Sequence, residues 1–250
     1  NRERGLALDP EELIAVREHF SQRGVHPTDV ELETIAQTWS EHCAHKTFRA
    51  NITTESGASR PSLINQLRAS TDKINAPYVV SSFVGNAGII SLTPGRTLAV
   101  KCETHNHPSA IEPFGGANTG VGGVIRDIMG AQHTPIACTN ILCFGPPDTD
   151  TLTLPEGVFP PRRTRDGVID GIADYGNKIG LPTVAGAVLY DSGYTANPLV
   201  YAGCIGTSNS YIDQVVPQPR DRIVVLGGRT GRDGLRGATF SSMTMDATTG

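Results

Sequence analysis

The part of the sequence that most constrains the fold begins after Pro77, where two β-branched runs flank a short turn. Residues 78–92, YVVSSFVGNAGIISL, and residues 97–104, TLAVKCET, have the composition of strands, and TPGR between them is typical of a tight turn. We predict four more strands from similar runs: IACTNILCFG, LPTVAGAVLY, LVYAGCIG and DRIVVLGG. These six strand-like runs predict a β-sheet, and a sheet must bury at least one of its faces against another layer of the protein.

Helical patterns precede and interrupt these strands. Residues 10–24 place apolar side chains on one helical face and are followed by a polar connection. A second helix begins at Thr28, which has capping-box spacing to Glu31, and we predict that it continues into WSEHCAHK, residues 39–46. Two further helices are predicted at residues 63–74 and 167–180.

The order of the elements, two helices and then strands mixed with helices, predicts an α+β fold whose sheet is covered on one side. At roughly 150 residues per domain, a chain of 250 residues predicts one or two domains. We divide the sequence into a helical region at 1–50, an α+β domain at 51–216 and the start of an incomplete second domain at 217–250.

Composition excludes several classes of function. The net charge is −4, so nothing suggests binding to nucleic acid. No run approaches the ~18 apolar residues of a membrane helix, and the first residues do not form a signal peptide. The five cysteines form no CxxC pair, which argues against structural zinc and favours reduced thiols in the cytoplasm.

The segment KCETHNHPSA, residues 101–110, carries a mixture of charges at the end of a predicted strand. Side chains alternate along a strand, so Lys101, Glu103 and His105 share one face within about 13 Å. A carboxylate suits Mg²⁺, and a lysine suits a phosphate. The alternative is an exposed strand end with unrelated polar residues.

Two other interpretations of this segment fail on chemistry. Zinc would need further nitrogen or sulfur ligands that no motif supplies. The His-Asn-His letters at residues 105–107 match those of a nuclease, but such a site needs a ββα-metal context and usually a basic surface.

The segment PFGGANTGVGGVIRD, residues 113–127, is predicted as a glycine loop that opens a helix. Such a loop offers backbone N–H groups to an anion, although it matches neither GxGxxG nor a Walker A loop. Arg126 could hold a phosphate and Asp127 a metal. The alternative is a flexible turn followed by an ion-paired helix.

In WSEHCAHK, the spacing of His42 to His45 and to Lys46 predicts one shared helical surface. The alternative is a structural histidine near a helix end. Cys43 is not part of a recognisable Cys-His pattern.

Together these stretches resemble one family, the synthetase subunit or domain of phosphoribosylformylglycinamidine synthase, over residues 28–242. The resemblance lies in WSEHCAHKTF, APYVVSSFVGNAGII, KCETHNHPSAIEPFGGANTGVGGVIRDIMG, GVIDGIADYGNKIGLPTV and VVLGGRTGRDGLRGATFSS. It implies the α+β fold of aminoimidazole ribonucleotide synthetase. It also implies an ATP-dependent carbon–nitrogen ligase of purine biosynthesis, which converts formylglycinamide ribonucleotide and ammonia into the amidine, ADP and phosphate.

The resemblance also implies roles for single residues. Glu103 matches a Mg²⁺ ligand, and Asp127 matches a ligand of a second Mg²⁺. Lys101 and His45 match positions that contact ATP. His42 matches the active-site histidine of the SEHC motif.

Five more residues match the substrate site of the family. Thr104, Asn106 and His107 match positions that line the substrate. His105 lines the substrate too and is the implied proton acceptor. Arg126 matches the arginine that binds the substrate phosphate.

The implied partners are a glutaminase subunit or domain that supplies ammonia and a small accessory subunit. An exposed strand edge would also favour pairing with a second copy in a homodimer. The family's subunits are longer and contain two related halves, so the sequence is interpreted as an N-terminal fragment of one. Ala187 stands where many members have an acid. The alternatives are a catalytically incomplete fragment that only binds nucleotide or dimerises, and another ATP-using synthetase of the same fold.

Overall fold

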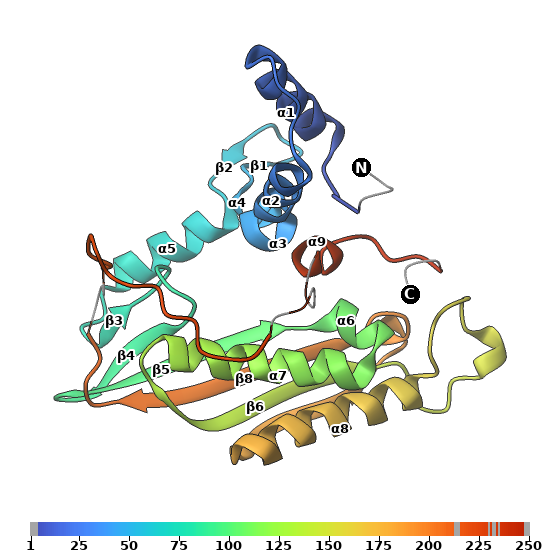
Figure 1. Ribbon diagram of the computed structural model, residues 1–250. Helices are drawn as coiled ribbons and strands as arrows, with labels where there is room; N and C mark the ends of the chain where they lie inside the picture. The colour runs from blue at the N-terminus through green and yellow to red at the C-terminus, as the bar shows by residue number, and fades with distance from the viewer. Residues whose placement is uncertain (1–4, 213–215, 230, 232–233, 235, 248–250) are drawn as a thin grey trace. The chain divides into compact units, whose positions relative to one another are not determined.

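The computed structural model describes residues 5–212, 216–229, 231, 234 and 236–247 (Figure 1). The chain divides into two compact units. The first unit consists of residues 1–74 and 222–244, and the second of residues 75–221 and 245–250. The predicted three-part division of the sequence stays a prediction.

The first unit is mostly helical. Its first two helices, α1 (Pro10–Gln22) and α2 (Asp29–Trp39), confirm the predicted patterns. Each begins with a capping box, made by Asp9 and by Thr28, which satisfies backbone N–H groups of the first turn. The remaining elements of this unit are α3 (Glu41–Ala44), α4 (Lys46–Arg49), β1 (Ile52–Thr53), β2 (Ser59–Arg60), α5 (Leu63–Ile74) and α9 (Gly237–Phe240).

The predicted continuation of the second helix through residues 39–46 is wrong. α2 ends at Trp39, and Ser40 has an extended backbone and caps the short helix α3 with its hydroxyl. His45 then adopts the left-handed conformation between α3 and α4, with φ of 51°. His42 and Lys46 therefore do not lie one turn apart on a continuous helix.

The second unit contains a six-stranded sheet of order β3-β4-β5-β8-β6-β7. The pairs are antiparallel, except that β6 and β7 are parallel. The strands are β3 (Val79–Ser81), β4 (Gly88–Thr93), β5 (Arg96–Thr104), β6 (Thr134–Phe144), β7 (Thr183–Tyr190) and β8 (Leu199–Ser208). In its described residues this unit also contains the helices α6 (Asn106–Ile111), α7 (Pro113–Gly130) and α8 (Pro161–Ile179), with short 3₁₀ turns at Thr151–Thr153 and Ser192–Tyr194.

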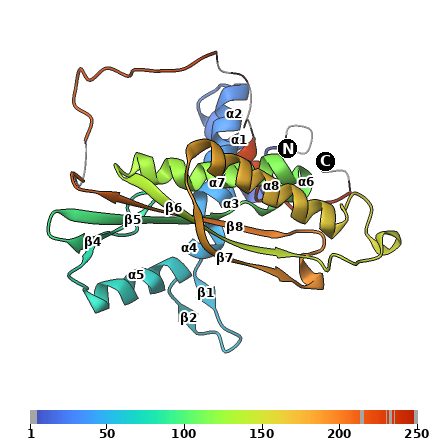
Figure 2. The same ribbon diagram turned by 90° about the horizontal axis from the view of Figure 1, so that it is seen from below.

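α7 and α8 pack against one face of the sheet (Figures 1 and 2). Neighbours along a strand alternate in burial: Ala99 is fully buried beside Val100, and Leu142 is buried beside Ile141. Val100 and Ile141 are 44% and 40% exposed. The structure thus confirms an α+β fold with the sheet covered on one side.

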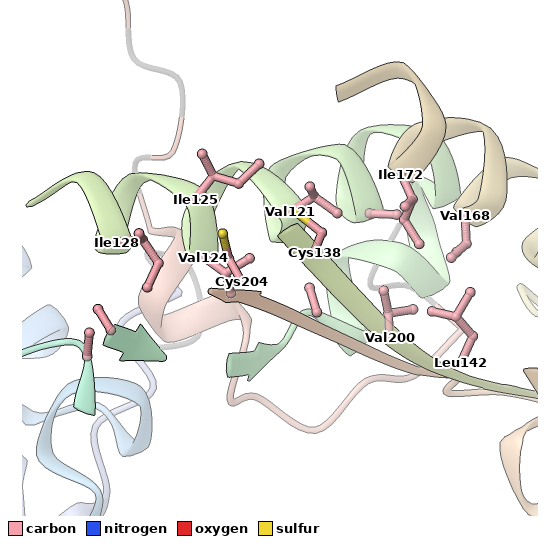
Figure 3. Packing of buried hydrophobic residues seen from close by; sticks show 14 of the residues in the cluster. Val121, Val124, Ile125, Ile128, Cys138, Leu142, Val168, Ile172, Val200 and Cys204 are labelled. Carbon is pink, nitrogen blue, oxygen red and sulfur yellow. The ribbon is translucent and has the colours of Figure 1, made fainter. Parts of the chain in front are cut away.

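The core of the second unit lies between these helices and the central strands (Figure 3). Burying each of its larger aliphatic side chains contributes about 1.5–3 kcal/mol. Its larger members are Ile89, Val121, Val124, Ile125, Ile128, Leu142, Phe144, Val168, Ile172 and Val200. Among the described residues this is the larger of two buried clusters; the other, in the first unit, consists of Leu6, Leu8 and Ala36.

The predicted glycine loop is also wrong, because residues 115–123 lie inside helix α7. These glycines permit close packing. A Cβ at Gly116 would lie 2.4 Å from the backbone nitrogen of Ser109, and one at Gly171 of α8 would lie 2.3 Å from the carbonyl oxygen of Phe114. Arg126 and Asp127 consequently lie in the last third of α7, and they do not open a helix.

Other boundaries differ in smaller ways. The run at residues 78–92 forms two strands, β3 and β4. α8 begins at Pro161, six residues earlier than predicted, and proline is well suited to the first helical turn. No strand forms at residues 221–228, where the side chains of Ile223 to Leu226 are 71–97% exposed, because no neighbouring strand pairs with this segment in the described part of the chain.

The described cysteines are all free: Cys43, Cys102, Cys138, Cys143 and Cys204. Among the described residues, none of the helices is both long and apolar enough to cross a bilayer.

Candidate active site

The centre of the candidate site is the end of β5. Lys101 and Glu103 lie on the same face of this strand, as the alternation of side chains predicts, and Lys101 Nζ is 3.6 Å from Glu103 Oε2. Both side chains are partly shielded from solvent. His105 follows the strand directly and precedes the first turn of α6.

Helix α7 brings a second carboxylate to this lysine. Asp127 Oδ2 lies 2.9 Å from Lys101 Nζ, so one ammonium group faces two carboxylates. The sequence interpretation missed Asn86, whose side-chain amide donates a hydrogen bond of 3.2 Å to Asp127 Oδ1. The segment GNAG before β4 was the available signal, because a polar residue between glycines marks a turn that can reach a neighbouring element.

α7 lies unusually close to the end of β5. A Cβ at Gly123 would come within 2.6 Å of Glu103 Oε1, and a Cβ at Gly120 within 2.8 Å of His105 Cβ. The glycines predicted to bind an anion through a loop instead give the helix room to lie over the site's side chains. The carboxylate of Glu103 is therefore held between a strand and a helix that share the core.

The oxygen donors of this cluster fit a magnesium ion that is shared with phosphates. Mg²⁺ in nucleotide sites is held by one or two carboxylates together with phosphate oxygens and water. Glu103 and Asp127 supply two such carboxylates, and Lys101 supplies a positive charge for a phosphate. Within the described ranges no three His, Cys, Asp or Glu side chains are grouped to hold a metal by themselves, so a ligand would have to complete the coordination.

The residues after Glu103 are fixed by the neighbouring strand β8. The His105 N–H donates to the Val200 carbonyl at 2.9 Å, and Asn106 Oδ1 accepts from the Val200 N–H at 2.8 Å. This places the carbonyl of the Asn106 side chain in a structural role. Thr104 is exposed on the strand face opposite Glu103, and His107 is half-buried in α6.

Arg126 precedes Asp127 on α7 and is exposed. Because successive helical residues point about 100° apart, its guanidinium does not share the direction of the Asp127 carboxylate. It can meet a phosphate at the rim of the cluster rather than at its centre.

His42 and His45 belong to the first unit, whereas the Lys101 cluster belongs to the second. His42 lies on α3, and its Nδ1 is 3.1 Å from the hydroxyl oxygen of Ser241. Lys46 Nζ forms an ion pair of 2.5 Å with Glu12. The structure thus brings Lys101, Glu103 and Asp127 together and places the two N-terminal histidines in a different unit.

Comparison with family models identifies two parts of the chain. Residues 84–208 match the model of the AIR synthase related protein, N-terminal domain. Residues 1–46 match the model of the formylglycinamide ribonucleotide amidotransferase linker domain.

The chain is also similar to characterised proteins. It is 39% identical to the phosphoribosylformylglycinamidine synthase subunit PurL of Thermoplasma acidophilum over 98% of its own length, which is 30% of that protein. It is 38% identical to the corresponding subunit of Picrophilus torridus over 99% of its length and 31% of the relative. The chain therefore spans about a third of the length of the curated relatives it matches.

Three solved structures from Thermotoga maritima share the fold. The structure of PurL complexed with FGAR has a TM-score of 0.65 and 36% identity, covering 92% of this chain and 32% of that one. The structure of PurL complexed with ATP gives 0.63 and 34%, with 92% and 33% covered. The structure of PurLQS gives 0.61 and 34%, also with 92% and 33% covered.

Proposed function

The chain belongs to the AIR synthase related family, and from this premise we propose that it forms part of a phosphoribosylformylglycinamidine synthase. The proposed reaction is the ATP-dependent conversion of formylglycinamide ribonucleotide and ammonia into formylglycinamidine ribonucleotide, ADP and phosphate. The observation that carries the proposal is the cluster of Lys101, Glu103 and Asp127, which lies inside the region matched by the family model.

The cluster has the chemistry that phosphoryl transfer from ATP requires. Such transfer depends on positioning and charge neutralisation more than on covalent chemistry of the protein. Glu103 and Asp127 would hold Mg²⁺, which when bound neutralises developing charge on the phosphates. In this proposal Lys101, which contacts both carboxylates, would turn to a phosphate oxygen when the metal binds, and Arg126 would bind the substrate phosphate.

The remaining roles follow the proposed reaction. ATP phosphorylates the amide oxygen of the substrate, ADP leaves, and ammonia then attacks the carbon and displaces phosphate. The attacking nitrogen must lose a proton, and we assign its acceptance to His105, with His42 as the second catalytic histidine. Thr104, Asn106 and His107 line the substrate, and His45 contacts ATP in this scheme.

The proposed partners are a glutaminase that supplies ammonia and a small accessory subunit. The similarity to the PurLQS structure supports an assembly of several different subunits. A homodimer and a cytoplasmic location complete the proposal; five free cysteines are compatible with a reducing compartment.

A second candidate function is that of a nucleotide-binding module without turnover. The observation that favours it is the small donor set of the cluster, because among the described residues two carboxylates, Glu103 and Asp127, face Lys101 and no third metal-binding side chain joins them. Such a module would bind Mg²⁺ with ADP or ATP but release no phosphate.

An assay of ADP release distinguishes these candidates. The synthase predicts release of ADP that requires Mg²⁺, formylglycinamide ribonucleotide and ammonium together. Nucleotide binding without turnover supports the module. Turnover with an unrelated acceptor in place of formylglycinamide ribonucleotide would contradict the synthase and favour another synthetase of this fold.

A further inference from the structure

The segment after residue 235 returns to the N-terminal helices within the first unit. The guanidinium of Arg236 donates to Glu33 Oε1 on α2 at 3.0 and 3.2 Å. Thr239 is 1% exposed and accepts a hydrogen bond of 3.4 Å from Gln37, also on α2. These contacts hold α9 against α2 and α3, and Ser241, the residue that ends α9, lies beside His42 as a consequence.

Among the described residues, the hydroxyl of Ser241 has two hydrogen-bonding neighbours. Its oxygen is 3.1 Å from His42 Nδ1 and 3.1 Å from the carbonyl oxygen of Ala238. A hydroxyl has a single proton and two lone pairs, whereas a carbonyl oxygen can only accept. The contact with Ala238 is therefore favourable only when Ser241 donates its proton to that carbonyl.

The same constraint determines which ring nitrogen of His42 carries the proton. Once the Ser241 proton points to Ala238, the remaining contact is favourable only if His42 Nδ1–H donates to the Ser241 oxygen. If Ser241 instead donated its proton to His42 Nδ1, lone pairs of the Ser241 hydroxyl oxygen and the Ala238 carbonyl oxygen would face each other across 3.1 Å, which is unfavourable. Both contacts are satisfied together by one arrangement.

We infer that Ser241 is a positioning residue that holds the neutral His42 ring in the tautomer protonated at Nδ1. The lone pair then resides on Nε2, which becomes the basic nitrogen and the atom that can accept a proton or a hydrogen bond from a ligand. The catalytic value of this arrangement rests on the proposed function, in which His42 takes part. The tautomer itself depends only on contacts within the first unit.

Nitrogen-15 NMR of the 250-residue chain tests the inference, because the two ring nitrogens of a neutral histidine have distinct shifts in each tautomer. We expect Nδ1 to carry the proton in the unsubstituted chain at a pH where His42 is neutral. Ser241→Ala should change the ratio of the tautomers about fivefold towards Nε2–H, the range that one hydrogen bond of ordinary strength supports. Ser241→Thr keeps the hydroxyl and should restore the original ratio.

Ser242→Ala is the matched control. Ser242 also donates to the Ala238 carbonyl, at 3.2 Å, but of these two serines it is Ser241 whose hydroxyl oxygen accepts the hydrogen bond from His42 in the inferred arrangement. This variant should leave the tautomer ratio unchanged, so an effect limited to Ser241→Ala cannot come from a general loosening of the segment.

A proton on Nε2 in the unsubstituted chain would overturn the inference, and so would a ratio that Ser241→Ala does not move. Either result leaves the proposed function standing, because the Lys101 cluster in the second unit is assayed separately by nucleotide binding. Conversely, loss of nucleotide binding would count against the proposed function without altering the tautomer of His42.

Discussion

In the second unit, Glu103 and Asp127 lie on a strand and a helix that share a large apolar core, whereas in the first unit His42 lies on a four-residue helix held by polar contacts. Packing against a core fixes a side chain through many contacts that water does not compete for. Exposed hydrogen bonds and ion pairs each contribute little net free energy. The comparison indicates that packing of the surrounding core fixes the carboxylates of Glu103 and Asp127. The position of His42 depends instead on a few hydrogen bonds and ion pairs, which single substitutions can remove.

The largest expected effect is on the stability of the two cores. Ile128→Ala removes a fully buried side chain of α7 and should lower the free energy of unfolding by about 2–5 kcal/mol. Leu13→Ala, beside the small cluster of the first unit, should cost less than about 2 kcal/mol, because its site is only partly buried. Urea denaturation checks this, with Trp39 fluorescence reporting the first unit and hydrogen exchange in β8 the second.

If Ile128→Ala and Leu13→Ala lowered the free energy of unfolding equally, the two units would not differ in how strongly their apolar clusters stabilise them. A loss below about 1 kcal/mol for Ile128→Ala would show that the core of the second unit does not stabilise its helix as the burial implies.

The second expected effect concerns the space that α7 leaves for Glu103. Gly123→Ala places a methyl group within 2.6 Å of Glu103 Oε1, so we expect the carboxylate to move and Mg²⁺-dependent ADP binding to weaken about tenfold. Alanine favours a helix over glycine by about 1 kcal/mol, so the fold should survive. Calorimetric titration measures the affinity.

Gly130→Ala, on the same helix, is the control, because a Cβ there meets no described atom within 4 Å apart from its chain neighbours and the adjacent helix backbone. Adding Glu103→Asp to Gly123→Ala shortens the crowded side chain and should recover part of the lost affinity. Independent, additive effects of the two substitutions would argue against the steric explanation.

A smaller effect is expected in the first unit from loss of an ion pair. Arg236→Ala removes the hydrogen bonds to Glu33, and because the arginine side chain is 45% exposed we expect at most about 1 kcal/mol of destabilisation. The tautomer ratio of His42 should nevertheless shift, because Arg236 anchors the segment that carries Ser241. Arg229→Ala, at an exposed position seven residues earlier in the chain, serves as the control. An unchanged tautomer ratio of His42 in Arg236→Ala would contradict the view that polar contacts position this histidine.

The smallest effect is a pH dependence at the start of α2. Hydrogen bonds from the Thr28 backbone and hydroxyl hold the pKa of Glu31 below its ordinary value of 4.5. A lowered folded-state pKa gives stability that is present above pH 4.5 and is lost as the pH falls through the folded value. Trp39 fluorescence in thermal melts should therefore show a difference between the unsubstituted chain and Glu31→Gln near neutral pH that vanishes in acid.

Glu55→Gln, at an exposed position, should show no such pH-dependent difference. A constant difference for Glu31→Gln across the acid range would mean that the carboxylate charge plays no part in the cap.

Local sequence patterns predicted much of this structure. Capping boxes, strand alternation and the shared face of Lys101 and Glu103 are local rules, and the structure follows them. The glycines at residues 115–123 led to the wrong prediction of a loop. They lie in α7 and let this helix pack closely against α6, α8 and the Glu103 carboxylate, and such tertiary packing is not visible in a local pattern.

Contacts between distant segments could not be predicted from local sequence patterns, because they also depend on tertiary packing. Asn86 meets Asp127 across 41 positions, and Ser241 meets His42 across 199 positions. No short-range periodicity encodes such pairs. The exposed apolar run at residues 221–228 was predicted as a strand from composition, but a strand needs a partner, and composition does not supply one.

We propose that Glu103, placed by the core of the second unit, forms part of a magnesium–nucleotide site. Calorimetric titration of ADP with and without Mg²⁺ tests this in the unsubstituted chain, in Glu103→Ala and in Glu156→Ala, which changes an exposed loop carboxylate. We expect Mg²⁺-dependent binding that Glu103→Ala abolishes and Glu156→Ala retains. Equal Mg²⁺-dependent binding in all three proteins would show that Glu103 is not part of such a site.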